Sequence, residues 1–95
     1  MISKIDIKKF FKYALKNVNE ILKNEDLDTE LKELYNNGSL HFIEKSVCYV
    51  LYNRHNYFTN TYKIDIDVED NHNRRICSYI LYLDEDENFI DEFLL

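Results

Sequence analysis

Residues 62–69 read Tyr-Lys-Ile-Asp-Ile-Asp-Val-Glu, and this regular alternation of apolar and polar side chains decides the interpretation of the whole chain. Successive side chains of a β-strand point to opposite faces of a sheet, so the stretch predicts a strand over about 57–68. Its apolar side chains should face a core, and its charged side chains should face solvent. The apolar set is Tyr62, Ile64, Ile66 and Val68. The charged set is Lys63, Asp65 and Asp67.

The residues after this strand predict two more strands. Residues 76–83 form a nearly continuous apolar run, typical of a central strand covered on both faces, and we expect a strand over about 75–84. The polar run 84–88 then forms a turn. The last element, over about 89–95, fits a strand or a helix by its apolar spacing. The tight turn before it favours a hairpin strand.

The residues before the strand allow two interpretations. The segment from Ser46 to Tyr52 is short and dense in β-branched and aromatic side chains, which favours a strand over about 46–53. The alternative is a third helix within 40–52, because several apolar side chains there also match helical spacing. They are Ile43, Val47, Val50 and Leu51.

The first third of the chain has the period of an amphipathic helix. Eight apolar side chains fall on one helical face and lysines occupy the others, which predicts a helix over about 4–23. The eight are Ile7, Phe10, Phe11, Ala14, Leu15, Val18, Ile21 and Leu22. Asp28 is a suitable N-cap for a second helix over about 28–36. Gly38, the only glycine of the chain, suits the left-handed residue that ends this helix.

Together these elements predict one α+β domain over residues 1–95, with two N-terminal helices packed on an antiparallel meander of three to four strands. A length of 95 residues is that of a single domain. A content of 45% hydrophobic and 15% aromatic residues is enough for a packed core, which argues against disorder.

The charge of the chain is unevenly distributed. The net charge is −6, yet residues 1–36 balance seven lysines against seven acids, and residues 37–64 carry three bases against one acid. Residues 65–95 carry ten acids against two arginines. A reader of duplex DNA needs the opposite sign, because phosphate contacts supply most of its affinity. We therefore expect no direct binding of nucleic acid, and an acidic face that attracts a basic protein partner.

The ten acids of the C-terminal third are the predicted partner-binding residues. They lie in the flanks of the expected strands and in two turns, where they could form one face. They are Asp65, Asp67, Glu69, Asp70, Asp84, Glu85, Asp86, Glu87, Asp91 and Glu92.

No residue group has the spacing of a known catalytic or metal site. Asp84, Asp86 and Asn88 match the first side-chain positions of a calcium loop, but the loop would need Gly at 89 and Glu at 95. Paired carboxylates on the 57–68 strand have a usable spacing, yet a solvent-facing stripe is the better interpretation. A chain with one glycine has no phosphate-binding loop. We therefore predict no metal, no cofactor and no enzymatic activity.

The aromatic residues within 49–62 allow two interpretations. They are too poor in neighbouring bases for a platform that stacks single-stranded nucleic acid. Packing in the core is the better interpretation, and some of the tyrosines could instead be contacts in a protein interface. The set is Tyr49, Tyr52, Tyr57, Phe58 and Tyr62.

The sequence also suggests a cellular compartment. The N-terminus has no apolar signal region, and no apolar run approaches the roughly 18 residues that span a membrane. Cys48 and Cys77 lie in apolar surroundings, so we expect two buried thiols rather than a disulfide or a metal pair. These features predict a cytoplasmic protein.

In size, charge and expected layout, the chain resembles bacterial immunity proteins, including those of contact-dependent growth inhibition systems. No family motif is matched, so the resemblance assigns no role to individual residues. It implies a protein that neutralises a basic toxin, possibly a nuclease, by covering its active site. One alternative is a phage-encoded anti-defence protein whose acidic face mimics nucleic acid. Another is a ligand-binding or enzymatic domain of cystatin-like or nuclear-transport-factor-like fold, with a deep cavity lined by Tyr and Phe.

Overall fold

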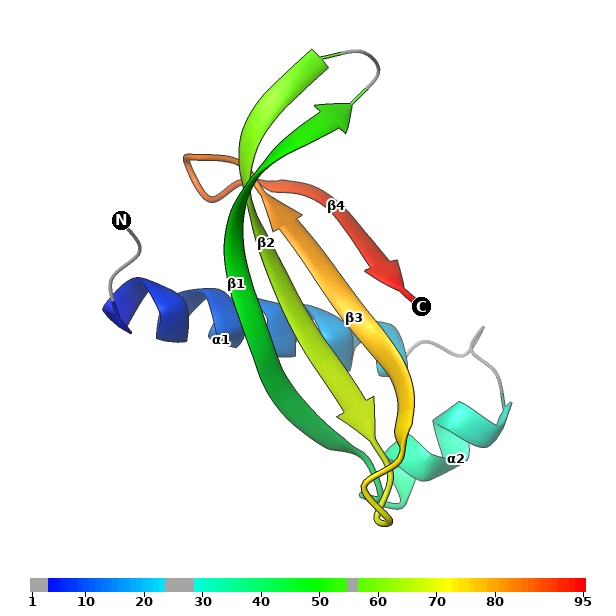
Figure 1. Cartoon of the computed structure of the whole chain (residues 1–95). Helices are drawn as coiled ribbons and strands as arrows, with labels where there is room; N and C mark the ends of the chain where they lie inside the picture. The colour runs from blue at the N-terminus through cyan, green and yellow to red at the C-terminus, as the bar shows by residue number, and fades with distance from the viewer. Residues whose placement is uncertain (1–3, 24–28, 55–56) are drawn as a thin grey trace.

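The computed structural model describes residues 4–23, 29–54 and 57–95. Over these residues, two helices precede four strands, which form one antiparallel sheet in chain order (Figure 1). The elements are α1 (Lys4–Leu22), α2 (Thr29–Asn36), β1 (His41–Arg54), β2 (Tyr57–Glu69), β3 (Arg75–Leu83) and β4 (Phe89–Leu94). The predicted α+β fold, with both helices preceding an antiparallel meander, is confirmed.

Both segments that the sequence left open between helix and strand are strands. β1 begins at His41, five residues before the predicted start, and pairs with β2 along its whole length, so the helix within 40–52 is not formed. β4 pairs with β3. Leu95 extends this pairing, because it exchanges two backbone hydrogen bonds with Ser78 at 2.9 and 3.0 Å.

Gly38 ends α2 as the sequence predicted. Its φ of 68° is in the left-handed region, where a residue without a side chain is favoured. The Gly38 N–H donates to the Tyr35 carbonyl, and the Ser39 N–H donates to the Leu34 carbonyl. This pair of bonds is the Schellman arrangement, which satisfies carbonyls at the helix end and directs the chain into β1. The predicted N-cap Asp28 lies outside the described residues.

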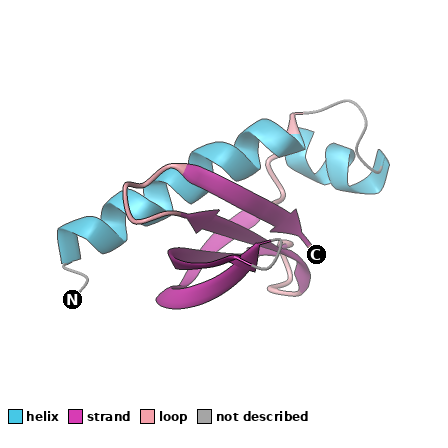
Figure 2. Ribbon diagram, turned by 90° about the horizontal axis from the view of Figure 1, so that it is seen from above, coloured by secondary structure: helices cyan, strands magenta, loops and turns pink. Residues whose placement is uncertain are grey.

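α1 covers one face of the sheet, and among the described residues no helix covers the other (Figure 2). The apolar stripe of α1 packs against the alternate residues of β2 and β3 that point toward it. Burial of each large side chain contributes about 1.5–3 kcal/mol, so this layer is the main source of stability. Its members include Phe10, Ala14, Val18 and Leu22 of α1, and Ile64, Ile66, Val68, Tyr79 and Leu81 of the sheet.

The uncovered face of the sheet is less open to solvent than the sequence suggested. The expectation that the charged residues of β2 all face solvent is wrong for Asp67, which is only 9% exposed. The sheet curves over this face: the Tyr52 ring of β1 stacks on Tyr82 of β3 at 4.5 Å between centroids. The Tyr52 hydroxyl also donates to Asp91 of β4 at 3.1 Å. Strand twist of this kind brings the first and last strands together and encloses the residues between them.

Replacement of one isoleucine in each layer tests this architecture. Ile66→Ala removes a fully buried side chain from the α1-facing layer and should lower the free energy of unfolding by about 2–5 kcal/mol. Ile43→Ala changes a side chain that is 40% exposed on the other face, and should cost about 1 kcal/mol or less. Urea unfolding followed by circular dichroism measures both. Equal losses would contradict a core on the α1 side.

Candidate partner-binding surface

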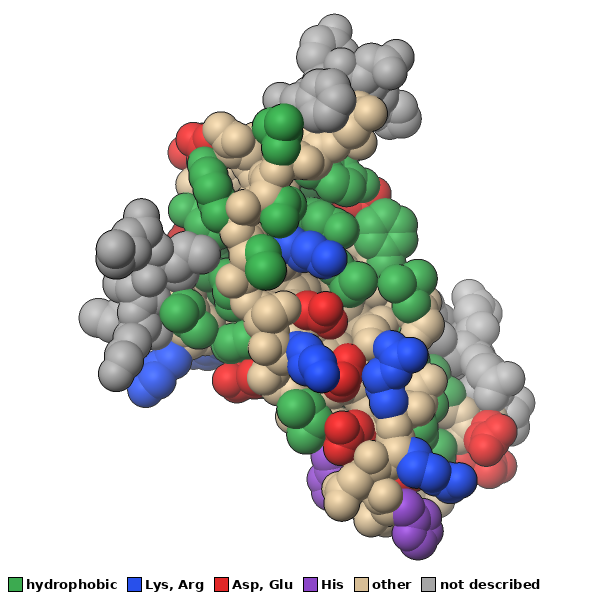
Figure 3. Space-filling view, in the orientation of Figure 1, with side chains coloured by type: hydrophobic (Ala, Val, Ile, Leu, Met, Phe, Trp, Pro, Cys, Tyr) green, Lys and Arg blue, Asp and Glu red, His purple; other side chains and the backbone are tan. Residues whose placement is uncertain are grey.

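The three predicted partner-binding acids of β2 (Asp65, Asp67 and Glu69) lie on the face that α1 leaves uncovered, where acidic and basic side chains alternate (Figure 3). Asp67 accepts a hydrogen bond from Ser78 Oγ at 2.8 Å, and its carboxylate lies 3.4 Å from Lys45 Nζ. The Ser78 hydrogen bond first, and then Lys45, hold the pKa of Asp67 below its usual value despite burial. Asp65 Oδ1 is also buried, but no hydrogen-bond donor reaches it among the described residues. Of these three acids, Asp67 is therefore the one whose charge is compensated within the fold.

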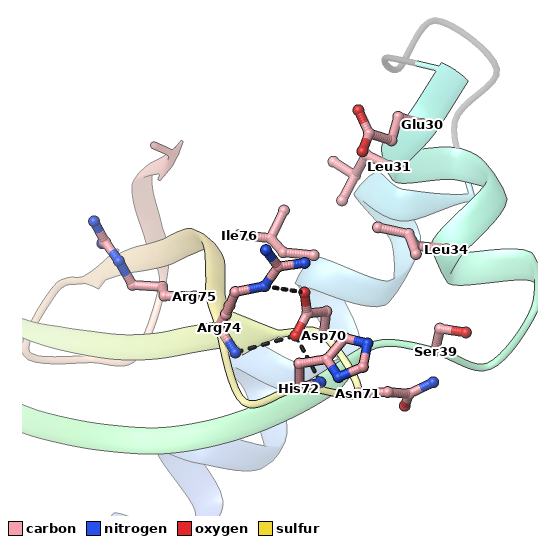
Figure 4. A pocket seen from close by; sticks show the side chains of 10 residues that line it. All are labelled: Glu30, Leu31, Leu34, Ser39, Asp70, Asn71, His72, Arg74, Arg75 and Ile76. Carbon is pink, nitrogen blue, oxygen red and sulfur yellow. Dashed lines mark hydrogen bonds and ion pairs between the residues drawn. The ribbon is translucent and has the colours of Figure 1, made fainter.

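Asp70 stabilises the turn between β2 and β3. Its Oδ1 accepts the backbone N–H groups of His72 and Arg74 at 2.8 and 3.1 Å, and its Oδ2 accepts Arg74 Nε at 3.1 Å (Figure 4). These bonds, the Arg74 backbone N–H foremost, lower the pKa of Asp70. Asn73 has a φ of 61°, a left-handed conformation that the same turn holds in place. A carboxylate used in this way shapes the chain and has little capacity left for a partner.

A hollow of about 550 Å³ lies between α2 and this turn (Figure 4). Leu31 and Leu34 of α2 and Ile76 of β3 form its apolar part, while the Asp70–Arg74 pair stands at its side. Among the described residues, neither Tyr nor Phe lines it. It therefore lacks the aromatic lining that the cystatin-like or nuclear-transport-factor-like interpretation predicts.

The residues Asp84–Glu87, here called the acidic turn, connect β3 to β4. Asp84 organises this turn: its Oδ1 accepts the backbone N–H groups of Asp86 and Asn88, each at 2.8 Å. The Asn88 N–H is the largest cause of the lowered pKa of Asp84. Glu87 has a φ of 68° and forms an ion pair with Lys9 of α1. The turn is thus held in one conformation, with the carboxylates of Glu85 and Asp86 exposed.

Tyr49 of β1 lies beside the acidic turn, although sequence reasoning had not placed it there. Its hydroxyl donates to Glu85 Oε1 at 2.9 Å, and this hydrogen bond raises the pKa of Tyr49. The ring contacts Tyr62 at 5.0 Å between centroids, but the residue is still 50% exposed. Leu51, two residues further along β1, is 63% exposed. The sequence signal for this patch was the aromatic set within 49–62, some of whose tyrosines could be contacts in a protein interface.

The two acids of β4 point to opposite faces of the sheet. Asp91 accepts the Tyr52 hydroxyl on the uncovered face. Glu92 lies on the α1 side, where it accepts the Tyr79 hydroxyl at 2.7 Å. Burial is the main reason that the pKa of Tyr79 is raised, so this phenol stays protonated and remains a hydrogen-bond donor. Both acids thus have partners within the fold.

The ten predicted acids therefore do not share one face. The turn that contains Asp70 and the acidic turn lie at opposite ends of the sheet (Figure 1). Four acids are grouped in the acidic turn, and Tyr49 adds an exposed aromatic ring beside them. This combination is the candidate partner-binding surface.

The structure also bears on the metal, cysteine and membrane expectations. Among the described residues, no group of three or more Cys, His, Asp or Glu is placed to hold a metal ion. Cys77 is buried as expected, whereas Cys48 is exposed, and both are free thiols. In the part of the chain that the structure describes, no helix combines the length and apolar character needed to cross a membrane. The chain matches no protein-family model, no curated protein and no solved structure.

The pH dependence of stability tests the role assigned to Asp70. Its folded pKa is lowered, so its stabilising contribution is fully present above the unfolded value of about 3.9 and is lost as pH falls from that value through the lower folded pKa. Asp70→Asn should therefore lower the thermal midpoint at pH 7, and the difference from the wild type should shrink toward pH 3. Asp86→Asn, at an exposed carboxylate, is the matched control. It should change neither the thermal midpoint at pH 7 nor the dependence of that midpoint on pH. A difference for Asp70→Asn that is constant with pH would contradict this role.

Proposed function

We propose that this chain is a small binding protein that inhibits a basic protein partner, as bacterial immunity proteins inhibit toxins. The acidic turn and Tyr49 are the contact surface in this proposal, and the partner's basic active site is what they cover. The proposed role places the chain in the cytoplasm of a bacterium.

The observation that carries the proposal is the preorganised state of the acidic turn. Asp84 fixes the backbone of the turn through two hydrogen bonds of 2.8 Å, so the backbone of Glu85 and Asp86 is already ordered before a partner binds. Preorganisation lowers the entropic cost of association. Asp67 and Asp70 are buried and accept internal hydrogen bonds. Glu85 and Asp86 are exposed, although Glu85 also accepts the Tyr49 hydroxyl.

The charges around the turn favour a basic partner. Lys9 offsets Glu87 alone, so the remaining acids of the turn attract cations over a Debye length of about 8–10 Å at physiological salt. Such a field speeds the encounter with a basic surface and orients it. Tyr49 adds an exposed aromatic ring, and tyrosine is among the residues that contribute most to binding energy in interfaces.

Charge reversal with a matched control tests the proposal. The variant Glu85→Lys/Asp86→Lys changes the acidic turn, and Glu33→Lys/Glu44→Lys makes the same change in charge at exposed residues of α2 and β1. Each protein, with the wild type, is immobilised and used to capture proteins from the source cell, with quantification by mass spectrometry. The wild type and the control should retain a basic protein that the turn variant captures at least tenfold less.

Two further measurements complete this test. Capture should fall as sodium chloride rises from about 0.05 to 0.5 M, because salt screens the attraction. Co-expression with the captured protein should suppress its toxicity when the wild type is used and fail with the turn variant. Equal capture by all three proteins would contradict the proposal. A captured defence nuclease in place of a toxin would favour the anti-defence alternative.

A further inference from the structure

β1 is an edge strand with a long unpaired side. The sheet order places it next to β2 only, and among the described residues no strand pairs with its outer side (Figure 1). Its 14 residues form the longest strand described. An edge strand presents a row of backbone N–H and C=O groups that another strand can bind.

One contact shows which residues of β1 direct their backbone groups outward. Thr61 Oγ1 of β2 donates to the Val50 carbonyl at 3.4 Å, so this carbonyl points toward β2. Backbone polar groups alternate in direction along a strand. The N–H and C=O groups of Tyr49 and Leu51 therefore point away from β2, toward the open side of the sheet.

The side chains of Tyr49 and Leu51 are exposed and apolar, so they offer a contact surface to an added strand. Tyr49 and Leu51 are 50% and 63% exposed, among the largest exposures of apolar side chains in the described residues. The stretch from Val47 to Leu51, here called the edge segment, carries no charge. It follows the bulge between Glu44 and Ser46, so the irregular part of β1 lies outside it.

We propose that a partner adds a strand to the edge segment, and that this strand carries basic side chains. The inference rests on the proposed function and names the form of the partner's contact. The Tyr49 hydroxyl lies 2.9 Å from Glu85 Oε1, so the acidic turn stands next to the edge segment on its α1-facing side. Side chains of an added strand alternate between the two faces, and those on the α1 side would meet Glu85.

The charge pattern selects a basic strand over other occupants. A second copy of this chain would bring two acidic turns, and a net charge of −6 on each molecule, toward one another. An acidic segment would meet the same repulsion. A segment with alternating basic and apolar residues would place its cations at the acidic turn and gain backbone hydrogen bonds from Tyr49 and Leu51.

A defined peptide tests the inference without knowledge of the natural partner. The probe is the acetylated and amidated peptide Lys-Val-Lys-Val-Lys-Val-Lys, whose lysines share one face when it is extended. Nuclear magnetic resonance titration gives its affinity, and amide hydrogen exchange locates its contact. Exchange at the Tyr49 and Leu51 amides should slow at least tenfold when the peptide is bound. A peptide with glutamate in place of lysine should bind at least tenfold more weakly.

Two changes isolate the backbone contribution. Leu51→Pro removes an outward N–H without loss of a bond to β2, and Leu51→Thr is the matched control because it keeps that N–H. The proline variant should bind the peptide at least tenfold more weakly than the threonine variant. The peptide can be changed in the same way: N-methylation at its third and sixth residues removes one N–H from each edge of the extended peptide. The wild-type protein should bind this peptide at least tenfold more weakly than the unmodified one. This second comparison uses the wild-type protein, so it remains decisive even if the proline variant does not fold.

The outcomes separate this inference from the proposed function. Equal affinity of the N-methylated and unmodified peptides would overturn strand addition, and so would slowed exchange on β4 in place of β1. Loss of partner capture by Glu85→Lys/Asp86→Lys, with full capture by Leu51→Pro, would retain the acidic turn as the contact and reject the strand. Dimers of the free protein in sedimentation would also overturn it if their formation slows exchange at the Tyr49 and Leu51 amides, because a second copy would then be the occupant of the edge.

Discussion

The packing of α1 on one face of the sheet is the contact on which the rest of the structure depends. The apolar stripe of α1 and the inward residues of β2 and β3 form the buried layer, in which Ile66 and Tyr79 are fully enclosed. A single helix covers one face only, so the other face has to limit its own exposure. It does so through the curvature that brings Tyr52 onto Tyr82, and through the pairing of Asp67 with Ser78 and Lys45.

This division explains why acids that are neighbours in sequence have different roles. A carboxylate that the fold encloses needs donors, because an unpaired buried charge is costly. Asp67 and Asp70 have them, and their lowered pKa values reflect those contacts. Glu85 and Asp86 lie in a turn at the end of the sheet, where solvent keeps their charge at little cost. The charge available to a partner is therefore much smaller, and more localised, than the composition of the C-terminal third suggests.

The parts of the fold that follow from local periodicity were predictable from the sequence. The period of two in 62–68 and the helical period in 7–22 identified β2 and α1, and Gly38 marked the end of α2. The curvature of the sheet was not predictable, because it depends on contacts such as Tyr52–Tyr82 between distant residues. For the same reason sequence alone gave no distinction between Asp70 and Asp86. Both occur in polar turns, and only the folded backbone gives Asp70 its donors.

Tyr49 links the two features that a partner would meet. Its backbone groups belong to the open edge of β1, while its hydroxyl holds Glu85 at 2.9 Å. Order imposed on β1 by an added strand would therefore also fix the position of Glu85, and a cation at Glu85 would in turn hold the Tyr49 ring. Contacts that share one residue are not additive, so the edge and the acidic turn should contribute to binding as one unit. Strand register and charge recognition are then properties of the same short segment, since the residue that offers its backbone also positions the carboxylate.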